Sequence, residues 1–258
     1  GILARMKQVT ITQAWGIMRG DGYTHQYEGD WQCTHPGQVL VGRAVTAVYM
    51  PRRPALRRLM EEKGERCGCI GDQISWPIDR LVPGDVYVAD MYGKIEDGPI
   101  IGDNLATAIY ARSGNGVVFD GSVRDLEGIE KIPDFTSFVR GWHPSYASPQ
   151  IMLMGINTPI RIGHATVMPG DVVLGKREGV VFIPPYLAEK VVKTSEIIHL
   201  RDAFGKARLR EGVYTSGQID ARWADDIERD FSRWMEDHID ELPVPKAAIQ
   251  EYLKERTW

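Results

Sequence analysis

Two short runs in the middle of the chain carry residue types that could do chemistry. Gly102-Asp103-Asn104-Leu105 lies where a loop enters an expected helix, and Arg124-Asp125 follows an apolar strand and a glycine turn. The first backbone N–H groups of a helix lack intrahelical acceptors and attract anions, so the first run predicts a cradle for a carboxylate or a phosphate. A plainer alternative is that Asp103 or Asn104 is only the N-cap of that helix.

The Arg124-Asp125 pair combines an anion-binding group with a metal-binding group. Arginine can hold a carboxylate or an enolate oxygen through two parallel hydrogen bonds. Aspartate can give one hard oxygen to Mg²⁺, which keeps most of its waters. The pair follows a strand, and α/β proteins build their sites at the carboxyl ends of strands. Adjacent opposite charges are also common as plain surface residues, and spacing alone leaves that alternative open.

Other familiar catalytic patterns are missing from the sequence. The six histidines show no His-x-x-x-His spacing, and there is no Gly-x-Ser-x-Gly elbow, Walker loop or Gly-x-Gly-x-x-Gly run. Serine hydrolases, nucleotide hydrolases and classical dehydrogenases therefore lose their main support.

Composition narrows the function classes further. The 258 residues include 31 Lys and Arg against 35 Asp and Glu, a formal net charge of −4, which argues against nucleic acid as a partner. No apolar run approaches the ~20 residues that span a bilayer, so no membrane partner is expected. Three cysteines cannot form a closed disulfide framework and suit a reducing compartment, so the expected location is cytoplasmic.

The elements that must position these runs alternate between strands and helices. Strands are expected at 86–90 and 117–119, each just upstream of one of the two runs, with a helix at 105–112 between them. Further upstream, Thr10 can cap a helix that carries apolar residues at i, i+3, i+4 and i+7. The fold class is α/β, and several consecutive strands argue against a purely doubly wound sheet.

The tail differs in pattern from the rest. Apolar side chains recur every four residues on an otherwise acidic helix, at Trp223, Ile227, Phe231, Met235 and Ile239. A break at 242–245 and a last helix at 246–256 are expected after it. A stripe this large must lie on its own domain or on a neighbouring subunit, and the three tail tryptophans, Trp223, Trp234 and Trp258, favour the neighbour. The expected organisation is a catalytic domain over 1–200 and a helical C-terminal extension over 201–258.

Beyond these local patterns, the chain resembles the RraA-like family, which includes class II 4-hydroxy-4-methyl-2-oxoglutarate/4-carboxy-4-hydroxy-2-oxoadipate (HMG/CHA) aldolases. The resemblance covers roughly residues 8–200. It is carried by Gly102-Asp103-Asn104-Leu105-Ala106, the Asp-Gly-x-x-Arg-Asp run at 120–125, and the two Pro-Gly-Asp-Val turns at 83–86 and 169–172. The segments 138–141 and 178–184 are similar as well.

The resemblance implies an α-β-β swivelling-domain-like sandwich, assembled as a homotrimer or hexamer. It implies a divalent metal, Mg²⁺ or Mn²⁺, held by Asp125 largely through waters. Arg124 would bind the 2-oxo acid and stabilise its enolate, and the amides of Gly102 to Leu105 would hold its carboxylate. Asp103 would orient a water on the metal that shuttles the proton. The implied function is a lyase that cleaves a 4-hydroxy-2-oxo acid through a pyruvate enolate, with oxaloacetate decarboxylation as a side activity.

The chain departs from the aldolase pattern in two respects. Aldolase members carry an acidic residue three positions after the metal-binding aspartate, where this chain has Gly128, flanked by Glu127 and Glu130. The segments 20–37 and 52–77 and the tail after 200 exceed the family core, and we expect them to reshape the substrate pocket. Two other functions stay open: a non-catalytic protein-binding regulator like RraA itself, and a sugar-acid dehydratase that uses the same metal site.

Overall fold

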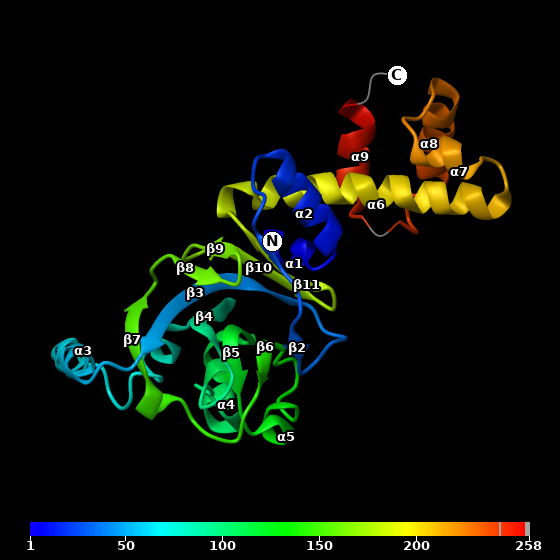
Figure 1. Cartoon of the computed structure of the whole chain (residues 1–258). Coiled ribbons are helices and arrows are strands. Elements are labelled where there is room, and N and C mark those ends of the chain that lie inside the picture. Colours follow the sequence, from blue (N-terminus) through cyan, green and yellow to red (C-terminus); the bar gives the residue numbers. More distant parts are fainter. Residues whose placement is uncertain (243, 256–258) are drawn as a thin grey trace. The chain divides into compact units, whose positions relative to one another are not determined.

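The computed structural model describes residues 1–242 and 244–255. The chain divides into two compact units, Gly1–Val191 and Val192–Trp258 (Figure 1). The first contains all the strands of the described residues and both candidate runs. The two units are distinguished by the contacts inside each of them. That the first unit is catalytic stays a prediction.

The first unit is built on a mixed sheet. Its path runs β1-β11-β10-β3-β4-β5-β6-β2, with β7 paired to β3, and β8 and β9 form a separate hairpin. The four central strands β3, β4, β5 and β6 are parallel, and β10, β11 and β7 run antiparallel to their neighbours. The bounds are β1 Tyr27–Glu28, β2 Gln32–Cys33, β3 Leu40–Pro51, β4 Asp85–Lys94, β5 Val117–Val123, β6 Ser137–Trp142, β7 Ile151–Ile156, β8 Ile160–Ile162, β9 Ala165–Val167, β10 Val172–Lys176 and β11 Gly179–Ile183.

Helices connect the parallel strands. α3 follows β3, α4 follows β4 and α5 follows β5, so each parallel pair is joined by a crossover that contains a helix. Near the N-terminus, the Thr10 hydroxyl accepts a hydrogen bond from the Gln13 backbone amide at 3.1 Å, and the Gln13 side-chain oxygen accepts one from the Thr10 backbone amide at 3.1 Å. This capping box confirms the expected cap of α2. The bounds are α1 Ile2–Met6, α2 Ile11–Gly20, α3 Pro54–Arg66, α4 Asp103–Ser113 and α5 Leu126–Ile129, with short 3₁₀ turns at Ile78–Arg80, Ser148–Gln150 and Pro185–Leu187.

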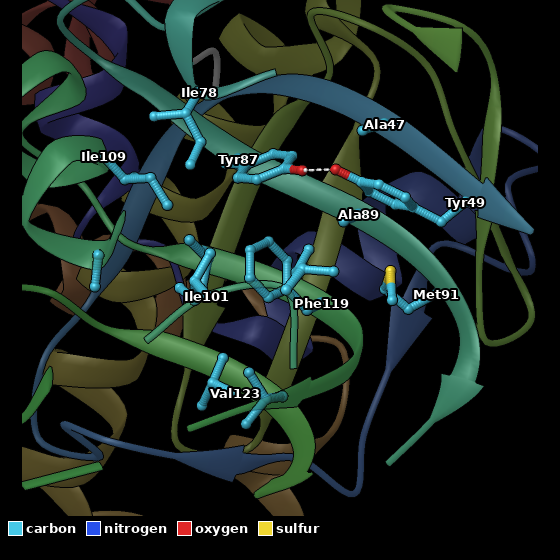
Figure 2. Close-up of a cluster of buried hydrophobic side chains, with 14 of the residues drawn as sticks. Ala47, Tyr49, Ile78, Tyr87, Ala89, Met91, Ile101, Ile109, Phe119 and Val123 are labelled. Atoms are coloured by element: carbon cyan, nitrogen blue, oxygen red, sulfur yellow. Dashed lines mark hydrogen bonds between the residues drawn. The ribbon is translucent and has the colours of Figure 1, made fainter. Parts of the chain in front are cut away.

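The sheet is buried on both faces, so its central strands are apolar at nearly every position. Alternate residues of β5 point to opposite sides: Phe119 belongs to the cluster that packs against α4, and Val118 to the cluster under the β8–β9 hairpin. Figure 2 shows the first cluster, where the hydroxyl groups of Tyr49 and Tyr87 form a hydrogen bond of 2.9 Å. This core supports the loops that follow β4 and β5.

An ion-pair network holds the irregular segment 20–37 on the sheet. The guanidinium of Arg140 contacts Asp120 at 2.8 Å and Glu28 at 3.3 Å, donates to the Gly29 carbonyl at 2.8 Å, and lies 3.7 Å from the ring centroid of Trp31. Arg140 and both carboxylate side chains are less than one fifth exposed, at 17%, 9% and 9%. The segment therefore has a structural anchor of its own.

The second unit has its own core. The helices that lie in it or reach into it are α6 Ala188–Glu211, α7 Ser216–Asp220, α8 Asp225–Asp237 and α9 Lys246–Glu255. Phe204 of α6 is fully buried and packs its ring against Trp223 and against Phe231 and Trp234 of α8, with ring centroids 5.2 to 5.7 Å apart. The stripe expected on the tail helix is thus buried by its own chain. Contact of the extension with a neighbouring subunit stays a prediction.

The α/β fold class with helices at the C-terminal end is confirmed, and the main differences lie at the element ends. α4 begins two residues before the expected start, and α6 extends to Glu211 where an end near 200 was expected. Three residues named in the tail prediction, Pro243, Arg256 and Trp258, lie outside the described residues. Within the described part of the chain, we find no helix with the length and apolar character needed to cross a membrane.

Candidate functional site

The two candidate runs lie at the carboxyl ends of neighbouring parallel strands. The loop after β4 leads to Gly102 and α4, and β5 ends at Val123, directly before Arg124. The residue before each run is anchored in the core, because Ile101 is 2% exposed and Val123 is fully buried (Figure 2). The Arg124 amide donates to the Ile101 carbonyl at 3.1 Å, so a backbone hydrogen bond joins the second run to the residue just before the first.

The start of α4 is only partly exposed, because Gly102 is buried, Asp103 and Leu105 are half-buried and Asn104 is exposed. Gly102 is the N-cap, in an extended conformation, and provides no side-chain cap. The Asp103 carboxylate accepts from the adjacent Asn104 amide at 2.9 Å. The alternative in which Asp103 or Asn104 is merely the N-cap is therefore wrong, because the helix already includes both residues. Because the cap has no side chain, the amides at the helix start other than that of Asn104 stay available for an anion.

Gly102 lies against the side chains of Asp125 and Arg124. A Cβ atom on this residue would lie 2.2 Å from Oδ2 of Asp125 and 3.2 Å from Nε of Arg124. Contacts under 3.0 Å essentially never occur for real Cβ atoms, so any larger residue would displace the Asp125 carboxylate. The glycine lets the backbone at the helix start approach both charged side chains.

Arg124 and Asp125 are held side by side and remain accessible. Nε of Arg124 lies 3.4 Å from Oδ2 of Asp125, and the two side chains are 39% and 49% exposed. Asp125 has φ of 57°, in the left-handed region that aspartate tolerates better than most residues. This conformation ends the extended chain at once, and α5 begins at the next residue. The Arg124 guanidinium also lies 5.8 Å from the ring centroid of Tyr146.

These residues share one small cavity of about 110 Å³. All six predicted site residues line it: Gly102, Asp103, Asn104, Leu105, Arg124 and Asp125. Five lining residues were not anticipated: Ile74, Pro99, Ile100, Ile101 and Tyr146. One residue of the segment 52–77, Ile74, lines the cavity, and a role of that segment in shaping a substrate pocket stays a prediction. No described residue of segment 20–37 or of the tail lines the cavity.

Gly128 lies against Asp103. A Cβ atom on residue 128 would lie 2.5 Å from Oδ2 of Asp103 and 2.6 Å from its Cβ. With the backbone as it stands, this chain has no room for the acidic residue that aldolases carry at that position. Neither flanking glutamate, Glu127 or Glu130, lines the cavity. The carboxylate of Asp103 occupies the space beside the glycine.

The donor set suits a hard divalent cation held mostly through water. Asp103 and Asp125 present carboxylates to the same accessible cavity, with Asp125 resting on the Gly102 backbone. The described residues contain no group of three or more His, Cys, Asp or Glu side chains that could hold a metal. Mg²⁺ usually binds through one or two carboxylates and keeps several waters, so the residues fit such an ion.

The sequence is similar to those of several known proteins. The chain is 26% identical over 176 residues to the protein DlpA of Legionella pneumophila, a match covering 68% of this chain and 26% of DlpA. It is 33% identical over 114 residues to a Halalkalibacterium halodurans protein provisionally named 4-hydroxy-4-methyl-2-oxoglutarate aldolase, covering 44% of this chain and 53% of that protein. The chain thus spans less than two thirds of the length of these relatives.

Solved structures agree on the fold. An uncharacterized protein from Pseudomonas syringae pv. tomato superimposes with a TM-score of 0.71 at 21% identity, covering 85% of this chain and 92% of that one. Streptomyces coelicolor RraAS2, described as an unusual member of the RNase ES inhibitor RraA family, gives 0.65 at 21% identity, covering 80% and 95%. The RraA-like (Aldolase/RraA) family model matches residues 10–182, and the chain therefore belongs to the RraA-like family.

Proposed function

We propose that this chain is a divalent-metal-dependent lyase that cleaves a 4-hydroxy-2-oxo acid to pyruvate and an aldehyde or ketone. The observation that carries the proposal is the shared cavity, in which Arg124, Asp125 and Asp103 meet the start of α4. The relative with an aldolase name supports the same class and suggests a divalent metal, Mg²⁺ or Mn²⁺.

The residues divide the binding of the substrate between them. The amides of Gly102 to Leu105 hold the carboxylate of the 2-oxo acid, since a helix start favours an anion. The Arg124 guanidinium then donates to the 2-oxo oxygen, where negative charge develops as the C3–C4 bond breaks. Asp125 would hold the metal, which when bound would supply Lewis-acid stabilisation of the developing negative charge.

The proton movements fall to Asp103. Cleavage requires a base for the 4-hydroxyl proton and an acid that returns a proton to C3 of the enolate. Asp103 would hold a water that performs both transfers, and its fixed place beside Gly128 orients that water. Loss of carbon dioxide from oxaloacetate passes through the same enolate, so we include it as a side activity.

The deciding experiment is pyruvate release coupled to lactate dehydrogenase, from a panel of 4-hydroxy-2-oxo acids and oxaloacetate, with Mg²⁺ and with EDTA. We expect release that depends on the metal and falls at least ~100-fold in Asp125→Asn. Asparagine also tolerates the left-handed conformation of this position, so the variant should fold. No release from any acid would refute the lyase and favour a binding role or a dehydratase. Sedimentation of the same sample tests the proposed homotrimer or hexamer.

A further inference from the structure

The Arg124 side chain has few partners in the fold. Within the part of the chain that the structure describes, two groups attract its guanidinium: the Asp125 carboxylate, with Nε 3.4 Å from Oδ2, and the ring of Tyr146, whose centroid lies 5.8 Å away. The Arg140 guanidinium, by contrast, pairs with two carboxylates and lies 3.7 Å from the ring centroid of Trp31. Arg140 is therefore fixed by the fold, whereas Arg124 keeps N–H donors for a ligand.

The backbone on both sides of Tyr146 is held beside the two candidate runs. The His143 amide donates to the carbonyl of Val123, the last residue of β5, at 3.2 Å. The Ala147 amide donates to the Pro99 carbonyl at 2.8 Å. Ala147 is fully buried, and Pro99 lines the same cavity as Tyr146. The Tyr146 ring therefore starts from a fixed place next to the second run.

An aromatic ring can hold an arginine in a way that a carboxylate cannot. The face of the ring attracts a guanidinium within about 6 Å of its centroid, and this attraction uses none of the N–H donors. In the proposed function, on which this inference rests, Asp125 also binds a divalent metal, whose charge would weaken the pull of that carboxylate on Arg124. The attraction of the Tyr146 ring does not depend on that carboxylate. The ring can therefore hold Arg124 while its donors stay directed at the acid.

We propose that Tyr146 is a positioning residue, whose ring face holds the Arg124 guanidinium ready for the 2-oxo acid. A long arginine side chain loses rotamer freedom when it binds a ligand, and a contact that is already in place reduces this loss. The Tyr146 hydroxyl group has no part in the role, because the attraction comes from the ring. The side chain is 53% exposed, so substitutions there should leave the fold intact.

Binding of pyruvate measures this role without any turnover. Pyruvate consists of the 2-oxo acid head alone and has no C3–C4 bond to cleave, so titration calorimetry with the full chain and Mg²⁺ reports on the head. Tyr146→Phe keeps the ring and should keep the wild-type Kd within about 1.5-fold, whereas Tyr146→Leu should raise it about 2- to 5-fold, the range of a cation–π contact at an exposed site. Tyr186→Leu, at an exposed tyrosine that does not line the cavity, should keep the wild-type Kd.

A double-mutant cycle tests whether the ring acts through Arg124. In an Arg124→Met background the ring has no cation to hold, so adding Tyr146→Leu should change the Kd by less than about 1.5-fold. A merely structural role of Tyr146 would weaken binding equally in both backgrounds, and that result would overturn the inference. If Arg124→Met binds pyruvate too weakly to titrate, the comparison of Tyr146→Phe with Tyr146→Leu decides alone.

The outcomes for Tyr146 and for the proposed lyase can be told apart. Equal Kd values for the wild type and a folded Tyr146→Leu, an equal loss of affinity in Tyr146→Phe, or no binding of pyruvate by the wild type would each overturn the positioning role. If a 4-hydroxy-2-oxo acid nevertheless releases pyruvate, the lyase stands without it. If the Kd values are as expected and no acid releases pyruvate, the positioning role stands and the lyase falls.

Discussion

A single methyl group added at Gly128 should disable the site while leaving the fold in place. In Gly128→Ala, the new Cβ would start 2.6 Å from the Cβ of Asp103, and ordinary van der Waals contact begins at 3.4 Å. The two atoms must therefore separate by about 0.8 Å, the difference between those distances. The Cβ of Asp103 is fixed by its backbone, so a change of rotamer cannot relieve the contact, and the start of α4 or α5 must move.

The size of the effect follows from the required shift. A misplacement of ~1 Å in a catalytic group can cost ~100-fold in rate, so we expect kcat/KM for pyruvate release to fall about 10- to 100-fold. The stability change should be modest. Alanine in place of a helical glycine gains ~0.5–1 kcal/mol, and overpacking costs ~1–3 kcal/mol, which leaves a net loss of at most ~2.5 kcal/mol in the free energy of unfolding.

A matched control is available in α2. Gly16 is helical and a Cβ there meets nothing within 4 Å, so Gly16→Ala should raise stability slightly and leave pyruvate release unchanged. Gly128→Asp, which restores the acidic residue of the aldolases, introduces the same Cβ and should be no more active than Gly128→Ala. Steady-state kinetics and urea unfolding of the three variants check these expectations. Wild-type kcat/KM in a folded Gly128→Ala would refute the positional role assigned to Asp103.

Three further predictions concern the scaffold. Arg140→Met removes the charge partner of two buried carboxylates, so the free energy of unfolding in urea should fall by ~3–5 kcal/mol. Arg112→Met removes one partner of an exposed ion pair and should lower it by less than ~1 kcal/mol. Equal losses in the two variants would contradict a stabilising role for the Arg140 ion-pair network. Burial raises the pKa of Asp90, so the folded state favours its protonated form, and that contribution is lost as pH rises through the folded pKa. Asp90→Asn should therefore be more stable than wild type at pH 7, with the gap closing toward pH 4, and a constant gap would be inconsistent with this cause. Phe204→Ala removes the centre of the C-terminal core and should destabilise that unit by ~3–5 kcal/mol, followed by tryptophan fluorescence; a loss under ~1 kcal/mol would show that the ring is dispensable.

Local patterns in the sequence were sufficient for several of the central elements and for the six predicted residues that line the cavity. The cap at Thr10 and the apolar runs of the strands each act over a few residues, so they can be read without knowing the fold. The same holds for the helix start at Gly102. Even there, the plainer N-cap alternative could be rejected only when the backbone showed which residue begins the helix. The glycine turn expected between the strand at 117–119 and Arg124 is wrong, because β5 continues through Asp120 and Gly121 to Val123 and all its residues are buried.

The tertiary structure decided which distant residues face the candidate chemistry. Ile74 and Tyr146 carry no local signal of a site, yet both line the cavity. Asp72 accepts hydrogen bonds from the Ile74 amide and from the hydroxyl of Ser148, two residues after Tyr146, so a long-range contact joins the two segments. The contact between Gly128 and Asp103 likewise depends on how α5 lies against α4. The sequence by itself determined the strand alternation and the charged groups at the strand ends, because these follow from backbone geometry and side-chain periodicity. Only long-range packing could determine that Ile74 and Tyr146 also line the cavity, because the strand register and the crossovers that bring them there are not encoded in local patterns.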